Sequence, residues 1–245
     1  MDYYLTLLFD PTAWIALSAL VAMEVVLGID NLVFISVLTN KLPKEIRFRI
    51  QRIGIAFALI LRLALLGLLS ILVGLTAPLF SIMDHSFSLR DIVLILGGLF
   101  LVWKATKEIH EKIEGREETN HAPKDVIISG AGAAIAQIIL LDLVFSIDSI
   151  VTAVGMVNEL PIMFAAVIIT VGFMMVAARP LSTFVDSKPS VLMLALSFLI
   201  MIGMTLIADG FGFHVPKGYI YAAMAFSAAV EALNIFARRK RMPQS

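Results

Sequence analysis

The chain has 245 residues, of which 60% are hydrophobic and only 16% are charged, whereas about 25% are charged in a typical soluble domain. Nineteen Lys and Arg residues balance nineteen Asp and Glu residues, so no basic excess remains to neutralise nucleic-acid phosphates. The absence of Cys excludes disulfides and thiolate metal sites, and leaves oxygen or imidazole ligands for any metal. This composition excludes a disordered or nucleic-acid-binding chain and predicts a membrane protein.

Seven apolar stretches approach or exceed the length of about 20 residues that a helix needs to cross a bilayer. The expected spans are residues 12–38, 53–77, 91–109, 126–156, 161–178, 190–208 and 219–237. The fifth span is short, and we expect it to continue past Arg179 toward Asp186. The predicted fold class is all-α, a polytopic membrane protein in which residues 1–245 form a single transmembrane domain.

Basic residues are concentrated in every second connection between the expected spans. Segments 40–52, 104–124, 179–188 and 238–241 together hold sixteen Lys and Arg residues, whereas the opposite connections hold only Arg90 and Lys217. Because basic residues near the ends of spans are retained in the cytoplasm, we expect the N-terminus outside and the C-terminus in the cytoplasm. The expected location is the cell (inner) membrane.

Two of the expected spans carry a related acidic string. The first contains Glu24-Val-Val-Leu-Gly-Ile-Asp30-Asn31, and the fourth contains Asp142-Leu-Val-Phe-Ser-Ile-Asp148-Ser149. The copies lie three spans apart, in the first and the fourth, so they cross in opposite directions and predict an inverted repeat of the kind found in secondary transporters. We expect residues 12–112 to form the first half, 113–124 a cytoplasmic linker, 125–209 the second half, and 217–241 an additional helix with a basic tail.

The repeated acids predict a metal site inside the membrane. An ionised carboxylate at bilayer depth costs about 2.5–3.5 kcal/mol, so four acids in matched positions indicate a function. Carboxylate and amide oxygens favour Mg²⁺, Ca²⁺ or Mn²⁺ over Zn²⁺. The expected metal ligands are Glu24, Asp30, Asn31, Asp142, Asp148 and Ser149.

The spacing of the four acids predicts which of them can bind the same ion. Two acids six positions apart on an ideal helix point about 120° away from each other, so they share one ion only if the helix breaks. Gly28 and Ser146 lie between the acids, where a small residue permits either a break or the close approach of another helix. Depth along the spans predicts that Glu24 and Asp142 meet near the centre, with the second Asp of each string on opposite sides of it.

Four further polar residues are expected to form a secondary site or gate, namely Arg62, Arg179, Glu231 and Asn234. The two arginines follow the second Asp of their strings by 32 and 31 residues, and they can neutralise some of the intramembrane acids. Glu231 and Asn234 lie one helical turn apart near the basic cluster at 238–241. A salt bridge between Glu231 and that cluster is the alternative interpretation.

At these strings the chain resembles the TerC family of integral membrane proteins, which is similar in turn to the LysE-type exporters. The resemblance extends to Gly97-Gly98-Leu-Phe-Leu-Val-Trp103-Lys104, His214-Val-Pro-Lys-Gly-Tyr219 and Val230-Glu231-Ala-Leu-Asn234. It implies a seven-span metal transporter, with manganese export as the best-supported activity, in a short form that lacks the CBS-type domains of some relatives.

The leading hypothesis is therefore an exporter of divalent cations, with Mn²⁺ as the expected ion. One alternative is an exporter of amino acids or other organic cations, in which the acids would bind an ammonium group. Another is a membrane accessory protein that assists metal loading and transports nothing. No enzyme activity is expected, because no Ser/His or His-Glu-x-x-His pairing occurs. The expected partners are a divalent metal ion and the lipid bilayer, with no cofactor and no nucleic acid.

Overall fold

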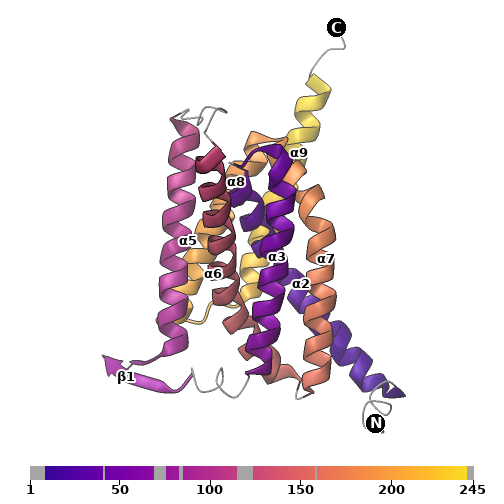
Figure 1. The fold of residues 1–245 in the computed structure, drawn as a ribbon, viewed down its shortest axis with the longest axis vertical. Coiled ribbons are helices and arrows are strands. Elements are labelled where there is room, and N and C mark those ends of the chain that lie inside the picture. Colours follow the sequence, from indigo (N-terminus) through magenta and orange to yellow (C-terminus); the bar gives the residue numbers. More distant parts are fainter. Residues whose placement is uncertain are drawn as a thin grey trace.

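The computed structural model describes residues 9–40, 42–68, 76–82, 85–114, 124–157 and 159–241. Within these residues the chain forms a bundle of long helices (Figure 1). The helices are α2 (Pro11–Thr39), α3 (Lys44–Gly67), α5 (Leu89–Ile113), α6 (Lys124–Met156), α7 (Leu160–Asp186), α8 (Pro189–Gly210) and α9 (Lys217–Arg241). Two short strands, β1 (Pro78–Ile82) and β2 (His85–Ser88), pair antiparallel at one end of the bundle. The predicted all-α polytopic fold is confirmed.

Six of the seven described helices are long and apolar enough to cross a membrane. The exception is α5, which was expected as the third span. Its second half carries Lys104, Lys107 and Glu108, and these charges lower the apolar character of any window long enough to span. The helix nevertheless has 25 residues and packs along α8, so it is part of the bundle.

Helix boundaries follow the sequence prediction except in the second span. As expected, α7 continues through Pro180 to Asp186. The second span was expected at 53–77, but α3 starts earlier, directly after Pro43, and ends at Gly67. Its charged first turns are helical because Arg47 is buried and donates hydrogen bonds to the carbonyls of Asn40 and Leu42, at 2.6 and 3.2 Å. Residues 69–75 lie outside the described part, and strand β1 begins at Pro78, directly after the end of the predicted span.

Side-chain caps fix where two helices begin. The Asp10 carboxylate accepts hydrogen bonds from the Thr12 hydroxyl at 2.7 Å and the Thr12 backbone N–H at 2.9 Å at the start of α2. These bonds, the hydroxyl first, lower the pKa of Asp10 below its usual value. At the start of α5, Ser88 and Asp91 form a reciprocal capping box. The caps place both helix starts at the same end of the bundle (Figure 1).

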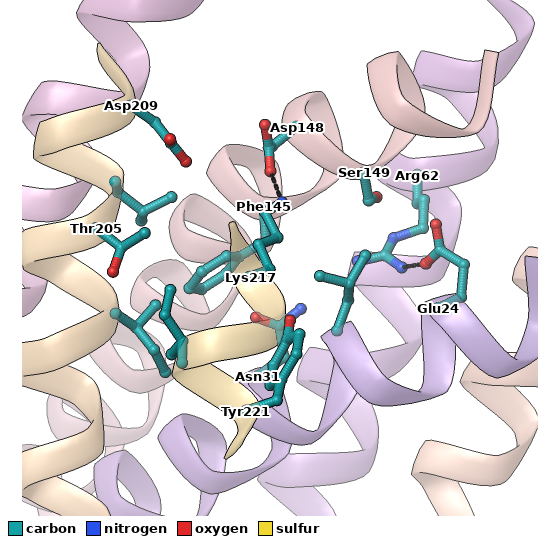
Figure 2. A pocket seen from close by; sticks show the side chains of 14 residues that line it. Glu24, Asn31, Arg62, Phe145, Asp148, Ser149, Thr205, Asp209, Lys217 and Tyr221 are labelled. Carbon is teal, nitrogen blue, oxygen red and sulfur yellow. Dashed lines mark hydrogen bonds and ion pairs between the residues drawn. The ribbon is translucent and has the colours of Figure 1, made fainter. Parts of the chain in front are cut away.

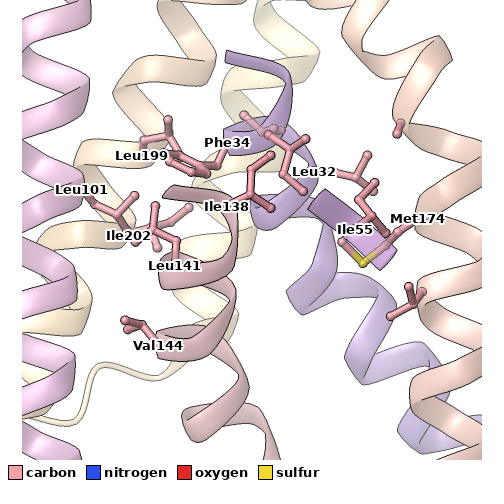
Figure 3. Close-up of a cluster of buried hydrophobic side chains, with 14 of the residues drawn as sticks. Leu32, Phe34, Ile55, Leu101, Ile138, Leu141, Val144, Met174, Leu199 and Ile202 are labelled. Carbon is pink, nitrogen blue, oxygen red and sulfur yellow. The ribbon is translucent and has the colours of Figure 1, made fainter. Parts of the chain in front are cut away.

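The apolar core lies where the central helices face one another. Figure 3 shows Leu32 of α2, Ile138 of α6 and Leu199 of α8 among its buried side chains. The backbones of α5 and α8 approach each other closely at Gly98, where a Cβ would lie 2.5 Å from the carbonyl oxygen of Gly203. Glycine is required at this crossing because even a methyl group would clash with the neighbouring backbone.

Helix packing supports the predicted inverted repeat. In the predicted halves, α2, α3 and α5 correspond in order to α6, α7 and α8. The main contacts agree with this correspondence, because α2 packs on α7, α3 packs on α6, and α5 packs on α8. In Figure 1, α2 and α6 also run in opposite directions. The inverted repeat remains a prediction, and this packing is what it requires.

Candidate ion-binding site

A single arginine brings the two repeated strings together. Arg62 of α3 donates from Nη1 to Glu24 Oε2 at 2.7 Å and from Nη2 to Asp142 Oδ1 at 3.0 Å. Only about 3% of the Arg62 and Glu24 side chains is exposed. Asn31 extends the cluster, since its Nδ2 lies 3.4 Å from the same Asp142 oxygen. The predicted meeting of Glu24 and Asp142 is therefore found, and Figure 2 shows Arg62 beside Glu24.

Gly28 and Ser146 occupy matching positions in the strings but have different functions. Of the two possibilities left open by the sequence, helix breaks do not occur, because α2 and α6 are continuous through these residues. Instead, a Cβ on Gly28 would lie 3.1 Å from the sulfur of Met174, so glycine permits the close approach of α7. Ser146 accepts a hydrogen bond from Arg62 Nε at 3.0 Å and donates one to Asp142 Oδ2 at 3.1 Å. Gly28 therefore permits close helix packing, whereas Ser146 binds the Arg62 guanidinium.

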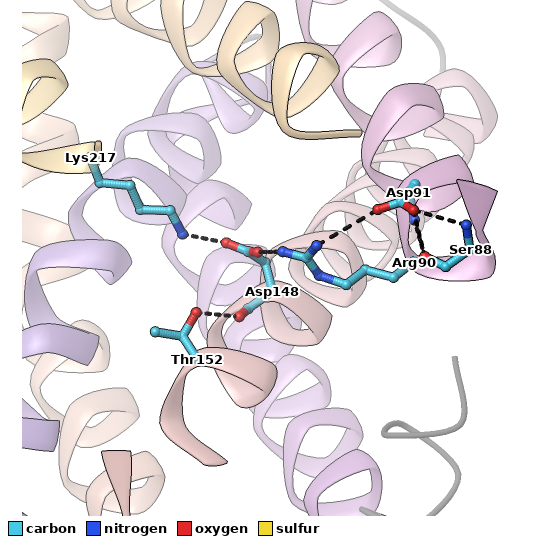
Figure 4. A network of polar contacts seen from close by, with 6 residues as sticks. All are labelled: Ser88, Arg90, Asp91, Asp148, Thr152 and Lys217. Carbon is cyan, nitrogen blue, oxygen red and sulfur yellow. Dashed lines mark hydrogen bonds and ion pairs between the residues drawn. The ribbon is translucent and has the colours of Figure 1, made fainter. Parts of the chain in front are cut away.

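Asp148 is paired with the two basic residues that the sequence places in the outer connections. Arg90, at the start of α5, donates to Asp148 Oδ1 at 2.5 Å. The ammonium group of Lys217, the first residue of α9, binds the other carboxylate oxygen. Figure 4 shows the three side chains converging from three helices. From the sequence, both cations were interpreted only as loop charges. The position of Asp148 near the outer end of its span could have indicated that these cations pair with it.

A cavity lies between these two charged clusters. Its lining includes four of the predicted ligands, Glu24, Asn31, Asp148 and Ser149, together with Arg62, Thr205, Asp209, Lys217 and Tyr221. About 50 Å³ of the cavity can hold the centre of a water molecule. At about 10–15 Å³ per water, this is room for roughly three to five water molecules. Oxygen donors from α2, α6 and α8 thus surround a space that fits a small, partly hydrated ion.

Asp209 is a buried cavity residue that the sequence analysis did not select. Its side chain is about 7% exposed, at the end of α8, and it interacts electrostatically with Asp148, His214 and Lys217. Figure 2 shows its carboxylate directed toward the same space as that of Asp148. The prediction missed it because residue 209 falls just beyond the expected span 190–208, where an acid is ordinarily solvated.

The predicted secondary-site residues do not form one group. Arg62 belongs to the central cluster, whereas Arg179 is exposed and its guanidinium lies 5.1 Å from the centre of the Phe48 ring. Glu231 and Asn234 lie on α9 and do not line the cavity. The side chain of Asp30 lies outside the described part of the structure.

The acidic side chains of the site are paired with basic side chains of the protein itself. Among the side chains that the structure describes, no three acidic or histidine side chains are placed together as a metal site. The physical reason is that Arg62 lies between Glu24 and Asp142 while Arg90 and Lys217 bind Asp148. A metal would therefore have to enter the cavity beside these cations or displace one of them.

The bundle of apolar helices and its buried ionic clusters define a polytopic membrane protein with a charged site inside the membrane-spanning region. The chain belongs to the TerC family of integral membrane proteins, which it matches over residues 9–244. This finding confirms the family resemblance read from the repeated strings.

Three relatives from Escherichia coli K12 extend this assignment. The chain is 54% identical over 231 residues to the UPF0053 inner membrane protein YgdQ, covering 94% of this chain and 96% of YgdQ. It is 51% identical over 232 residues to the UPF0053 inner membrane protein YoaE, covering 95% of this chain and 44% of YoaE. For the UPF0053 protein YegH the identity is 48%, over 94% of this chain and 44% of YegH. The chain thus spans less than half of YoaE and YegH. No solved structure matches it.

Proposed function

We propose that this TerC family protein is a transporter of divalent cations, with Mn²⁺ export as the specific activity. The observation that carries the proposal is the meeting of Glu24 and Asp142, one from each repeated string, beside a cavity lined by further oxygen donors. Buried carboxylates on apolar helices are costly, and in membrane proteins they mark ion pathways. Hard oxygen ligands suit Mn²⁺, Mg²⁺ or Ca²⁺.

Arg62 defines the ion-free state in this proposal. Its guanidinium neutralises Glu24 and Asp142 and leaves the other Glu24 carboxylate oxygen and the Asn31 amide oxygen as ligands on the cavity lining. A divalent cation that enters the cavity would bind these oxygens and weaken the hold of Arg62 on Glu24. Binding and a shift of Arg62 are thereby linked.

The size of the cavity favours a metal ion over an amino acid. The ammonium group of Lys217 already binds Asp148, and Phe145 and Tyr221 line the same cavity, features that suit an organic ammonium substrate. However, space for roughly three to five waters is smaller than a lysine molecule, which has about ten non-hydrogen atoms. We therefore place the organic-cation exporter second.

The location and orientation are part of the proposal. YgdQ and YoaE are named inner membrane proteins, and we propose the same membrane for this chain. The end of α2, the start of α3, the connection at 187–188 and the C-terminal end of α9 lie at one end of the bundle (Figure 1). The concentration of basic residues near that end supports its placement in the cytoplasm.

Ion flux into liposomes containing the purified protein tests this function. We expect saturable Mn²⁺ flux that exceeds the flux of Mg²⁺, Ca²⁺, Zn²⁺ and lysine, and that is lost in Glu24→Gln. Glu45→Gln is the matched control and should retain flux, because Glu45 is an exposed acid in the first turn of α3 and does not line the cavity. Flux of lysine without Mn²⁺ would favour the organic-cation exporter. Mn²⁺ binding without flux of any ion would favour the accessory protein.

A further inference from the structure

Lys217, the first residue of α9, lies at the end of the cavity where α9 begins. Its ammonium group binds Asp148, a cavity-lining carboxylate, and Lys217 itself lines the cavity. The Arg90 guanidinium binds the other Asp148 oxygen (Figure 4). Within the described residues, Lys217 is thus a cation of the protein that is held where an incoming cation would meet Asp148.

Of the two cations on Asp148, Lys217 is the one placed to leave. About 35% of its side chain is exposed, compared with about 16% for Arg90. Arg90 also lies 3.7 Å from Asp91, which the Ser88 capping box fixes at the start of α5. A lysine ammonium on a flexible stem binds as a point charge, whereas a guanidinium is held by its planar geometry.

The helix that carries Lys217 is weakly packed. Only 6% of the apolar window of α9 is buried, compared with 39–56% for the other candidate spans. It packs mainly on α8, through Ile220 and Met224 among its described side chains. The ion pair with Asp148 therefore makes a large contribution to holding the start of α9 against the bundle.

The charge of the cavity changes with the position of Lys217. Three lining residues are acidic, Glu24, Asp148 and Asp209, and two are basic, Arg62 and Lys217, so the lining has a net charge of −1. Withdrawal of Lys217 would change this net charge to −2, which one divalent cation would balance. A monovalent ammonium and a divalent metal therefore compete for the same carboxylates.

We propose that Lys217 is a tethered competitor of the transported cation, and that it closes this end of the cavity when no ion is bound. The proposal rests on the proposed function and adds a residue that the repeated strings do not contain. An ion that binds Asp148 releases Lys217, the start of α9 separates from α6, and the cavity opens at that end. The specific consequence is that removal of the lysine charge strengthens metal binding.

Equilibrium binding of Mn²⁺ to the purified protein in detergent provides the first test. Lys217→Gln should bind Mn²⁺ about tenfold more tightly or better, because a neighbouring charge shifts ionic equilibria by a factor of about ten to a thousand. Lys217→Arg keeps the charge and should bind Mn²⁺ no more tightly than the unmodified protein, because a guanidinium holds a carboxylate at least as firmly as an ammonium group does. The matched control is Lys107→Gln, since Lys107 is exposed and pairs with Glu111 at 3.9 Å on α5. Equal or weaker binding by a folded Lys217→Gln protein would overturn the proposal.

Thiol labelling provides a second test that does not depend on metal binding. The chain has no Cys, so Leu206→Cys introduces a single thiol at a buried cavity position of α8. A bulky, charged methanethiosulfonate reagent should modify this thiol faster when Lys217→Gln is added, and at an unchanged rate when Lys107→Gln is added. An unchanged rate in both would show that Lys217 does not close the cavity. If no variant binds Mn²⁺, the proposed function fails and competition fails with it, while faster labelling would still identify Lys217 as the closing residue.

Discussion

Arg62 and Glu24 form a buried ion pair of 2.7 Å between α3 and α2, although 38 residues separate them in the sequence. The same guanidinium reaches Asp142 on α6 at 3.0 Å. One cation thus joins a helix from each predicted half, and it neutralises part of the charge that would otherwise make their contact unfavourable. Arg62 therefore stabilises the helix bundle in addition to shaping the site.

Removal of the Arg62 charge should destabilise the protein strongly. Arg62→Gln leaves Glu24 and Asp142 buried without their cation, and loss of one partner from a buried pair typically costs about 3–5 kcal/mol. Arg179→Gln is the matched control, because exposed Arg179 loses only its stacking on Phe48, worth about 0.5–1 kcal/mol. Unfolding of both variants in detergent, followed by circular dichroism, measures the difference. Equal stability of the two variants would contradict the assigned position of Arg62.

The exchange of Glu24 for Gln should compensate for part of this loss. The double variant Arg62→Gln, Glu24→Gln removes one buried charge of each sign, so we expect it to be more stable than Arg62→Gln alone. Residues in one ion-pair network are not additive in their effects, and coupling energies of about 0.5–3 kcal/mol are usual. Strictly additive losses in the double-mutant cycle would mean that the two side chains do not interact.

Metal binding should distinguish the central acids from the acid on α9. We expect Glu24→Gln to weaken Mn²⁺ binding at least tenfold, a change of about 1.4 kcal/mol, because a cavity-lining charge is removed. Glu231→Gln should bind almost normally, since Glu231 does not line the cavity. Titration of both proteins with Mn²⁺ in detergent provides the comparison. Loss of binding in Glu231→Gln as complete as in Glu24→Gln would place the primary site on α9.

The glycine contact between α5 and α8 should be intolerant of even a methyl group. Gly98→Ala would place Cβ 2.5 Å from the Gly203 carbonyl oxygen, and we expect a loss of about 1–3 kcal/mol from overpacking. Gly172→Ala on α7 is the control, because its Cβ would meet no atom within 4 Å. There we expect a change of at most about 1 kcal/mol, in the stabilising direction, since Ala favours helix more than Gly does. Thermal unfolding in detergent tests both, and a neutral Gly98→Ala would indicate a wider helix crossing.

Reporter fusions should establish the orientation in the membrane. A reporter fused after Arg241 should be active in the cytoplasm, because basic residues concentrate at that end of the bundle. A reporter inserted at His214, in the loop before α9, should be active outside. We expect a reporter inserted at Asp84, which lies outside the described residues, to be active outside as well. An external C-terminus would reverse the proposed orientation and the direction assigned to each acidic string.

Sequence alone predicted the features that depend on local composition. Apolar length predicted the helices, and the repeated strings predicted that Glu24 and Asp142 meet, since both statements follow from periodicity and depth. The β1–β2 hairpin was missed because β1 directly follows the second expected span, so its mostly apolar residues showed no strand of their own. Its start coincides with Pro78, which cannot continue a helix in that position.

The cations of the site were the harder part to predict. Arg90 and Lys217 lie at helix starts, and nothing in their own neighbourhood shows that both side chains fold back onto Asp148. Arg62 and Arg179 follow the second Asp of their strings at similar distances in the sequence, and this spacing alone suggested that they have equivalent functions. In the structure Met174 faces Gly28 where Arg62 faces Ser146, so Met174 is the packing counterpart of Arg62. Such correspondences depend on which helix faces contact each other, and spacing does not contain that information.

The buried guanidinium also determines how a membrane voltage would act on the proposed transporter. Glu24, Asp142 and Arg62 together carry a net charge of −1, and a bound divalent cation would change it to +1. Each elementary charge that crosses 100 mV changes in energy by about 2.3 kcal/mol. A voltage that is negative inside therefore draws the loaded site inward and the empty site outward with equal force. Export of the ion against this voltage requires a second ion gradient to supply the work.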